Sequence, residues 1–129
     1  MTNELFGEVI SSYSRAQAIE DGVLVDVSSI AREAGIKFPV AVTSAVWVKY
    51  VEVPEGVTCQ DERGRLWDNL WMFRCAAAKF TGSTLLFKLN VRNHNRGRLD
   101  WRDLVTFKAL CGPGDDAEPV LTIMLPEED

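Results

Sequence analysis

The sequence is poor in the residues that form metal sites and disulfides. Its 129 residues include one histidine and three cysteines, and no two cysteines form a CxxC pair. An odd, scattered set of thiols does not indicate a disulfide framework, and a zinc site needs several suitably spaced His or Cys ligands. We therefore expect no metal ion and no other cofactor. We expect Cys59, Cys75 and Cys111 to be free thiols, buried as small apolar side chains.

Long apolar runs and leader sequences are also missing. The longest segment without a charge, residues 38–48, is about half as long as the roughly 20 apolar residues of a membrane-spanning helix. The first residues, MTNE, lack the cationic and apolar regions of a secretion signal. Neither GxGxxG nor the P-loop pattern GxxxxGK occurs, so no defined phosphate-binding motif is present. We expect a cytoplasmic protein that does not contact membranes.

Acidic residues outnumber basic residues overall, but the positive charge is concentrated in one region. Fourteen Lys and Arg against nineteen Asp and Glu give a formal net charge of −5, which excludes a generally basic nucleic-acid coat. Residues 88–108 nevertheless contain six cations and two anions, a net charge of +4, whereas the residues from 112 onward contain six acids and no base. This asymmetry places the candidate binding surface in the basic segment.

The first part of the chain shows short elements separated by clear stop signals. Capping and glycine signals indicate helices over 15–21 and 28–34, with a short strand over 23–27 that is a candidate sheet edge. Segment 40–51 fits a strand, because it is rich in β-branched residues, or a helix, because Pro39 suits a first helical position. We expect a helix there.

The clearest element is a helix that begins after Asp61 and continues to Phe80. Asp61 is a suitable N-cap, and apolar residues recur at helical spacing along one face. Trp67 and Trp71 lie four residues apart on an adjacent face. Such a helix needs burial over more than half of its circumference. We therefore expect it at the centre of the fold, with both indoles in the core.

After this helix the apolar period changes from 3.6 to 2. Alternating residues predict antiparallel strands over 85–91, 105–111 and 121–125, and the glycine- and aspartate-rich segment 112–116 is a turn by composition. Helices first and strands last predict a single α+β domain over residues 1–129. We expect a C-terminal three-stranded antiparallel meander packed on the central, tryptophan-bearing helix.

The candidate binding site is the donor-rich loop between the first two of these strands. It offers guanidinium, amide and imidazole groups that can hold a phosphate or carboxylate, and a tryptophan that can stack on a base or sugar. The expected site residues are Arg92, Asn93, His94, Asn95, Arg96, Arg98 and Trp101. The alternative is a solvated hairpin loop whose arginines pair with the acidic C-terminal segment.

His94 also allows a catalytic interpretation. Histidine can act as a general base near neutral pH, and so can a carboxylate such as Asp100 or Asp103 in a suitable pocket. Spacing alone assigns no nucleophile and no orienting carboxylate to His94. A small enzyme is therefore an alternative for which no catalytic residue is assigned.

Five segments of the chain are similar to an uncharacterised family of bacterial domains. They are 14–27, 38–43, 64–68, 91–93 and 111–116. Members of that family occur mostly on plasmids, integrative elements and phages. The resemblance implies a small accessory protein of mobile DNA without an established activity, and it assigns no catalytic residue. Because the family pattern does not require histidine at position 94, His94 is a poor candidate for shared chemistry.

These observations together predict a non-enzymatic accessory protein of a mobile genetic element. We expect it to bind a host or element macromolecule, a protein rather than a nucleic acid, in a regulatory or anti-defence role. One alternative is a binder of a nucleotide or another small anion on the loop 92–98, and a further alternative is a small enzyme with His94 as general base. The sequence leaves the oligomeric state open.

Overall fold

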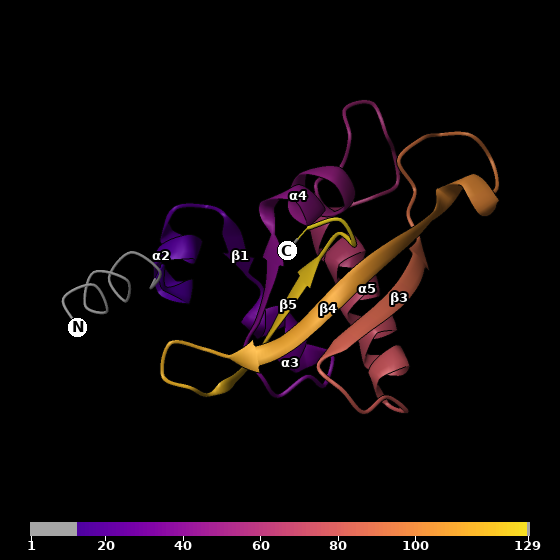
Figure 1. Cartoon of the computed structure of the whole chain (residues 1–129). Coiled ribbons are helices and arrows are strands. Elements are labelled where there is room, and N and C mark those ends of the chain that lie inside the picture. The colour runs from indigo at the N-terminus through magenta and orange to yellow at the C-terminus, as the bar shows by residue number, and fades with distance from the viewer. Residues whose placement is uncertain (1–12, 129) are drawn as a thin grey trace.

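A five-stranded mixed sheet in the order β1-β2-β5-β4-β3 forms the centre of the computed structural model, which describes residues 13–128 (Figure 1). The strands are β1 (Leu24–Asp26), β2 (Val40–Thr43), β3 (Thr84–Asn90), β4 (Leu104–Pro113) and β5 (Pro119–Met124). Neighbouring strands are antiparallel except β2 and β5, which are parallel. The helical elements are α2 (Arg15–Glu20), α3 (Ser28–Glu33), α4 (Ser44–Val46), the π-helix η1 (Trp47–Val51), α5 (Glu62–Ala77) and the 3₁₀-helix η2 (Trp101–Asp103).

The expected α+β class is confirmed, but the sheet extends beyond its C-terminal strands. β3, β4 and β5 are consecutive antiparallel neighbours. They do not form a sheet of their own, because β5 also pairs with β2, and β2 pairs with β1 at the edge. The N-terminal part of the chain therefore contributes two strands to the same sheet, where one edge strand was expected.

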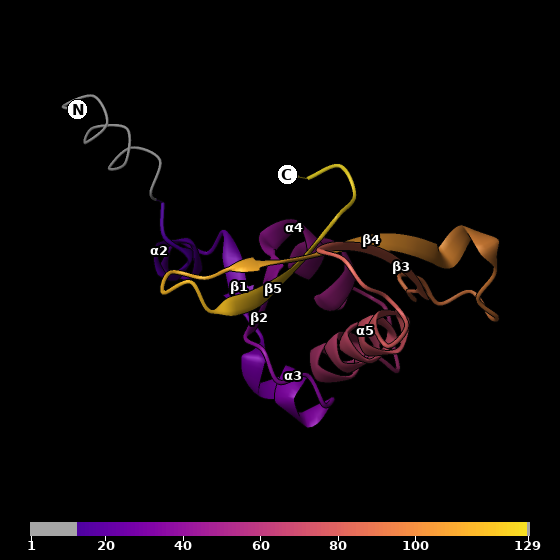
Figure 2. The ribbon, with the colours of Figure 1, turned by 60° about the horizontal axis from the view of Figure 1, so that its bottom comes forward.

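The core lies between the sheet and the helices α3 and α5, which cover the same face (Figure 2). Alternate residues of β3 and β4 point toward α5, as the period of 2 requires. Phe87 packs against Phe73 of α5 with ring centroids 5.9 Å apart and against Phe107 at 5.4 Å. Leu70 and Phe107 are fully buried. Such aromatic pairs add about 0.5–1.5 kcal/mol each beyond the apolar area they bury.

Segment 40–51 is a strand in its first part and helical in its second. The expectation of one helix is wrong for residues 40–43, since these form β2 and all four are buried. A strand buried on both faces shows no alternation, which is why its pattern did not separate it from a helix. Thr43 ends the strand and caps the following turn, because its Oγ1 accepts a hydrogen bond from the Val46 N–H at 3.3 Å.

Helix α5 begins as predicted but ends earlier and buries less. The Asp61 Oδ1 accepts a hydrogen bond from the Gly64 N–H at 2.6 Å, which confirms the N-cap, and the helix ends at Ala77 rather than at Phe80. The sheet covers one face of the helix only. Trp67 is therefore half-buried and Trp71 is 41% exposed, with the two indoles stacked 6.2 Å apart. The expectation that both lie in the core is wrong for Trp71.

The three cysteines are free but are not buried. Cys59 and Cys75 are exposed and Cys111 is partly exposed. Cys75 and Cys111 both line a hollow beside the C-terminal end of α5, and Cys111 packs against the edge of the core. The prediction of buried thiols was therefore wrong.

Candidate functional site

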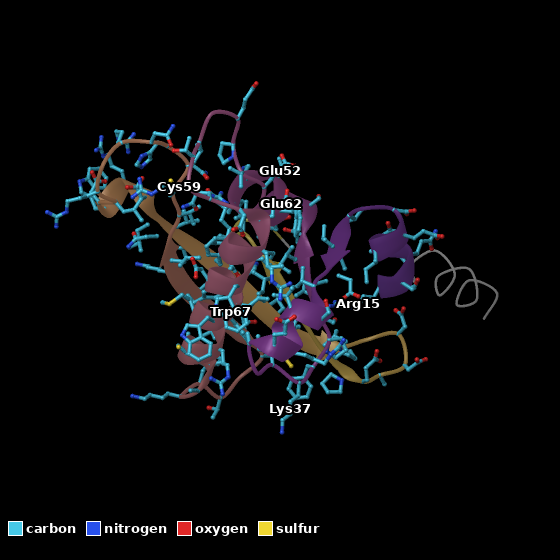
Figure 3. The ribbon with its side chains drawn as sticks, turned by 180° about the vertical axis from the view of Figure 1, so that it is seen from behind. Arg15, Lys37, Glu52, Cys59, Glu62 and Trp67 are labelled. Atoms are coloured by element: carbon cyan, nitrogen blue, oxygen red, sulfur yellow. The ribbon has the colours of Figure 1, made fainter. Side chains whose placement is uncertain are left out.

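The loop that joins β3 to β4, residues 91–103, projects beyond the rest of the sheet at one end of the molecule (Figure 1). We call it the tip. It contains every residue that the sequence placed in the candidate binding site. It lies beside the segment that precedes α5, on which Figure 3 labels Cys59. The contacts within the tip decide which of its side chains are free to bind.

Two asparagines of the tip hold it against that neighbouring segment. The Asn93 Nδ2 donates to the carbonyl oxygen of Lys49 at 3.0 Å, and the Asn95 Nδ2 donates to that of Gly56 at 2.7 Å. The Asn95 Oδ1 accepts from the backbone N–H of Thr58 at 2.9 Å. Both amides are used to position the loop, so they are not available to a ligand.

Arg65 of α5 connects the helix both to the tip and to the end of η1. Its guanidinium donates to the carbonyl oxygens of Val51 at 3.0 Å and Arg92 at 2.6 Å, and to the Asn93 Oδ1 at 2.6 Å. All three acceptors are neutral, and the residue is 6% exposed. Burial lowers the pKa of this guanidinium from its usual value. We call these three contacts the Arg65 latch.

Sequence reasoning did not identify this latch. Arg65 adjoins Leu66 at the start of the apolar face of α5, where a charged residue interrupts a buried stripe. An arginine at such a position indicates a buried polar contact, because a buried guanidinium group needs several hydrogen-bond acceptors. The acceptors come from segments distant in sequence, and no spacing rule connects them to the helix.

His94 is held between two partners. Its Nδ1 accepts a hydrogen bond from the Arg96 N–H at 3.1 Å, so the ring proton is on Nε2, which donates to the Asp103 Oδ1 at 2.6 Å. The side chain is 17% exposed. Because both ring nitrogens are engaged, the geometry gives His94 a role in fixing the loop and leaves it no open nitrogen for a substrate.

The two carboxylates that were candidate bases are also engaged. Asp100 caps η2 and forms an ion pair with Arg102 at 2.7 Å, and hydrogen bonds from Arg102 lower the pKa of Asp100 to about 2. Asp103 accepts the Asp100 N–H at 2.8 Å, which is the main cause of its lowered pKa, followed by the bond from His94. Carboxyl groups with lowered pKa values are weak bases at neutral pH.

The arginines of the tip pair within the tip itself. The Arg92 Nη1 donates to the carbonyl oxygen of Arg96 at 2.8 Å, and Arg96 lies 3.5 Å from Asp103. Within residues 13–128, the Arg98 side chain forms no hydrogen bond or ion pair. The alternative in which these arginines pair with the acidic C-terminal segment is therefore wrong for the described residues.

The acidic C-terminal segment makes its contacts elsewhere. The Glu128 carboxylate accepts from the Thr43 hydroxyl at 2.8 Å, and the Asp115 carboxylate accepts the backbone N–H groups of Arg15 and Ala16. The segment after β5 runs on the side of the sheet away from α5 (Figure 2). It stabilises the opposite face and the turn beside α2.

Five of the seven predicted site residues are exposed, namely Asn93, Asn95, Arg96, Arg98 and Trp101. The side-chain amides of the two asparagines are nevertheless engaged in hydrogen bonds. Trp101 is 82% exposed, and Leu104 beside it is 46% exposed. Four of the seven hold the loop through side-chain hydrogen bonds: Arg92, Asn93, His94 and Asn95. Two hollows, one beside α5 and one beside α2, are lined by other residues. The geometry thus favours a protruding contact surface over an enclosed anion pocket.

Two further observations concern the chain from residue 13 to residue 128. No group of three or more His, Cys, Asp or Glu in this part is arranged to hold a metal ion. No helix in the same part has the length and apolar character needed to cross a bilayer.

Comparison with known proteins gives one match. No curated protein and no solved structure matches the chain. Residues 2–129 match a family described as "Family of unknown function (DUF6573)", which confirms the expectation of a family without known function. Since the match covers nearly the whole sequence, the chain belongs to the DUF6573 family.

Proposed function

We propose that this protein is a non-enzymatic binding protein whose tip docks on an acidic surface of another protein. The observation that carries the proposal is the 82% exposure of Trp101. Tryptophan and arginine are enriched among the residues that dominate binding energy at protein interfaces. A protruding indole next to exposed guanidinium groups is such a combination.

The support beneath Trp101 is rigid, which favours binding. Trp101 begins η2, where Asp100 accepts the Arg102 N–H and Asp103 accepts the Asp100 N–H in a reciprocal capping box. Asp103 is buried and also holds His94. Because the loop is already ordered in the free protein, association does not have to restrict it, and more of the contact energy contributes to affinity.

The charge pattern favours a protein partner over a nucleic acid. Arg96 and Arg102 face carboxylates of their own loop at 3.5 and 2.7 Å, so Arg98 is the exposed guanidinium of the tip without an ion pair among residues 13–128. Nucleic-acid binding draws its affinity from several phosphate contacts at once. A single available guanidinium, three residues before Trp101 in the chain, instead matches a carboxylate next to an apolar pocket on a protein.

The biological setting follows from the resemblance in the sequence. The similar domains occur mostly on bacterial plasmids, integrative elements and phages, which supports a cytoplasmic accessory protein of mobile DNA. Its target is then a protein of the host or of the element. A regulatory or anti-defence role is consistent with that association.

The test compares two exposed tryptophans. A photo-crosslinking amino acid is placed at position 101 and, in a second protein, at position 71, and the products formed in a bacterial host are identified by mass spectrometry. We expect a discrete acidic protein to be captured from position 101 and not from position 71. Crosslinking to nucleic acid alone, or equal products from both positions, would overturn the proposal.

Binding to the purified partner provides the quantitative measurement. Trp101→Ala should weaken the complex by at least tenfold, which corresponds to about 1.4 kcal/mol, and Arg98→Ala should weaken it by a smaller factor that shrinks at high salt. Trp71→Ala is the matched control and should leave the affinity unchanged. The melting temperature of the Trp101 variant should be unchanged, because the indole is mostly in water.

A further inference from the structure

A groove of about 740 Å³ lies at the end of α5 opposite to the tip. It opens between the last two turns of α5, the connection from α3 to β2, and the adjoining ends of β3 and β4. Its apolar wall consists of Ile36, Phe38, Phe73, Ala77, Phe80 and Leu85. The volume is within the range of about 300–1,000 Å³ that is typical of small-molecule sites.

The groove exists because small residues occupy positions where larger side chains would fill it. Ala77 and Ala78 end the helix, and Gly35 and Gly82 line the opposite walls. At Gly35, φ is +92°, and an added Cβ would lie 2.8 Å from the Nε of Arg74. Any side chain at position 35 would therefore displace the Arg74 side chain.

Two large apolar side chains of the groove remain partly in water. Phe38 is 44% exposed and Phe80 is 43% exposed. Exposed aromatic area is unfavourable in proportion to its size, so an apolar occupant that covers both rings would bind favourably. This gives the groove a preference for a long apolar chain.

The charged residues of the groove are all cationic. They are Lys37 and Arg74, and no acidic residue lines the groove. The Arg74 guanidinium lies 5.2 Å from the ring centroid of Trp71 and, within residues 13–128, forms no ion pair. Figure 3 shows Lys37 pointing outward from the connection between α3 and β2. An apolar interior with a positive opening is complementary to an amphipathic anion.

We propose that this groove binds a free long-chain fatty acid. The acyl chain lies between the end of α5 and the ends of β3 and β4, covering Phe38 and Phe80. The carboxylate lies at the opening, where Arg74 can hold it with two parallel hydrogen bonds and Lys37 adds a second positive charge. This site is separate from the tip, so it does not depend on the protein-binding function proposed above.

The distribution of cysteines allows a test with an internal control. Cys75 and Cys111 line the groove, whereas Cys59 lies on the segment next to the tip. The full chain is treated with N-ethylmaleimide, with and without palmitate below its aggregation limit, and the modification of each cysteine is followed by peptide mass spectrometry. We expect palmitate to slow alkylation of Cys75 and Cys111 at least tenfold and to leave Cys59 unchanged. If palmitate leaves the alkylation rates of Cys75 and Cys111 unchanged, the proposal is wrong.

The contribution of the carboxylate is tested with methyl palmitate, which has the same chain without the charge. Palmitate should protect the two groove thiols at a concentration at least tenfold lower than the ester does, and Arg74→Gln should abolish that difference. Protection by the acid and the ester at equal concentrations in the unmodified protein would refute the assignment of the opening as a carboxylate site.

Chain length and groove volume give a third measurement. Each additional pair of methylenes should tighten binding up to about tenfold until the groove is filled, and Ala78→Leu should weaken binding of the longest chains first. A melting curve shows whether the variant is folded. If the two thiols are instead protected without ligand, and increasingly so as protein concentration rises, a second copy of the chain covers the groove and the proposal is wrong.

Discussion

The two ends of helix α5 differ in the side chains around them: hydrogen-bond donors surround the N-terminal end, and small residues surround the C-terminal end. At its N-terminal end, Arg65 joins α5 to the end of η1 and to the tip through neutral oxygens, and the asparagines of the tip complete the connection. At its C-terminal end, alanines and glycines leave a groove with little polar contact across it. The donor-rich side chains at the first end mostly hold the fold together, whereas the small residues at the second end line the groove.

The comparison bears on how a donor-rich loop is interpreted. A cluster of arginine, asparagine and histidine can serve a ligand or the chain itself, and the sequence does not distinguish the two uses. The partner of each donor decides, because a side chain with its hydrogen bonds already formed has little to offer a ligand. In this protein that criterion removes Arg92, Asn93, His94 and Asn95. Arg96 faces Asp103, so Arg98 and Trp101 are the expected site residues whose side chains have no polar partner among residues 13–128.

The largest effect that we expect comes from breaking the latch. Arg65→Met keeps apolar volume but leaves the acceptors at Val51, Arg92 and Asn93 without their donor. We expect a loss of about 3 kcal/mol in the free energy of unfolding, measured by urea denaturation. Hydrogen exchange should rise in residues 91–95, whereas the alkylation rate of Cys75 should not change.

The matched control is an exposed arginine on the same helix. The Arg63 side chain is 63% exposed and faces Glu33, so Arg63→Met should change stability by less than about 0.5 kcal/mol. Similar losses in the two variants would show that the latch contributes no more than a surface ion pair. Faster alkylation of Cys75 in the Arg65 variant would show that the two ends of α5 are not independent.

A smaller loss is expected from releasing the tip at one of its asparagines. Asn95→Ala removes the donor to Gly56 and the acceptor for Thr58, and it should cost about 1–2 kcal/mol. Asn95→Asp keeps the acceptor and should cost less, as measured by the same urea unfolding. If the aspartate variant is the less stable of the two, the hydrogen bond from Asn95 to Gly56 contributes more stability than the one that Asn95 accepts from Thr58, and the prediction is wrong.

A polar residue of α5 outside the latch should behave in the opposite way. Asn69 is 2% exposed, and its Oδ1 has no hydrogen-bond partner among residues 13–128. Replacing a buried group of this kind with an apolar side chain of similar size removes a desolvation cost. Asn69→Leu should raise the unfolding free energy by about 1 kcal/mol in thermal or urea denaturation. A loss of stability would show that the buried Asn69 side chain contributes more to the fold than its unpartnered oxygen costs.

The smallest effect concerns acid stability at the tip. Because bonds from Arg102 lower the pKa of Asp100 to about 2, against about 4 in the unfolded chain, its carboxylate stabilises the fold above pH 4. That contribution is lost as the pH falls from about 4 to about 2. The difference in urea midpoint between the unmodified protein and Asp100→Asn should therefore be present at pH 7 and vanish near pH 2. A difference that is constant with pH would rule out this ion pair as its source.

Local signals in the sequence predicted much of the fold. The N-cap at Asp61, the period-2 strands after Gly82 and the edge position of residues 24–26 all follow from short patterns. Segment 40–51 was misassigned because a strand buried on both faces loses the alternation that identifies it. Sequence patterns of this kind describe one element at a time. They mispredict a segment whose burial is set by neighbours on both of its faces.

The candidate site was harder to predict for the same physical reason. The location of the tip followed from its charge, but the roles of Asn93 and Asn95 depend on acceptors 44 and 39 residues away in the chain. The groove is produced by missing side-chain volume at Gly35 and Ala77, which lie on different elements. A sequence displays the residues that are present more clearly than the space that small residues leave between elements.

The position of β5 in the sheet has a consequence for synthesis of the protein. β5 is the last described strand along the chain, yet it lies in the middle of the sheet, between β2 and β4. During translation at about 5–20 residues per second, β2 waits for seconds with an unpaired edge until residues 119–124 leave the ribosome. A nascent chain stopped before Pro119 therefore carries two unjoined pieces of sheet, each with an open edge of the kind that promotes aggregation.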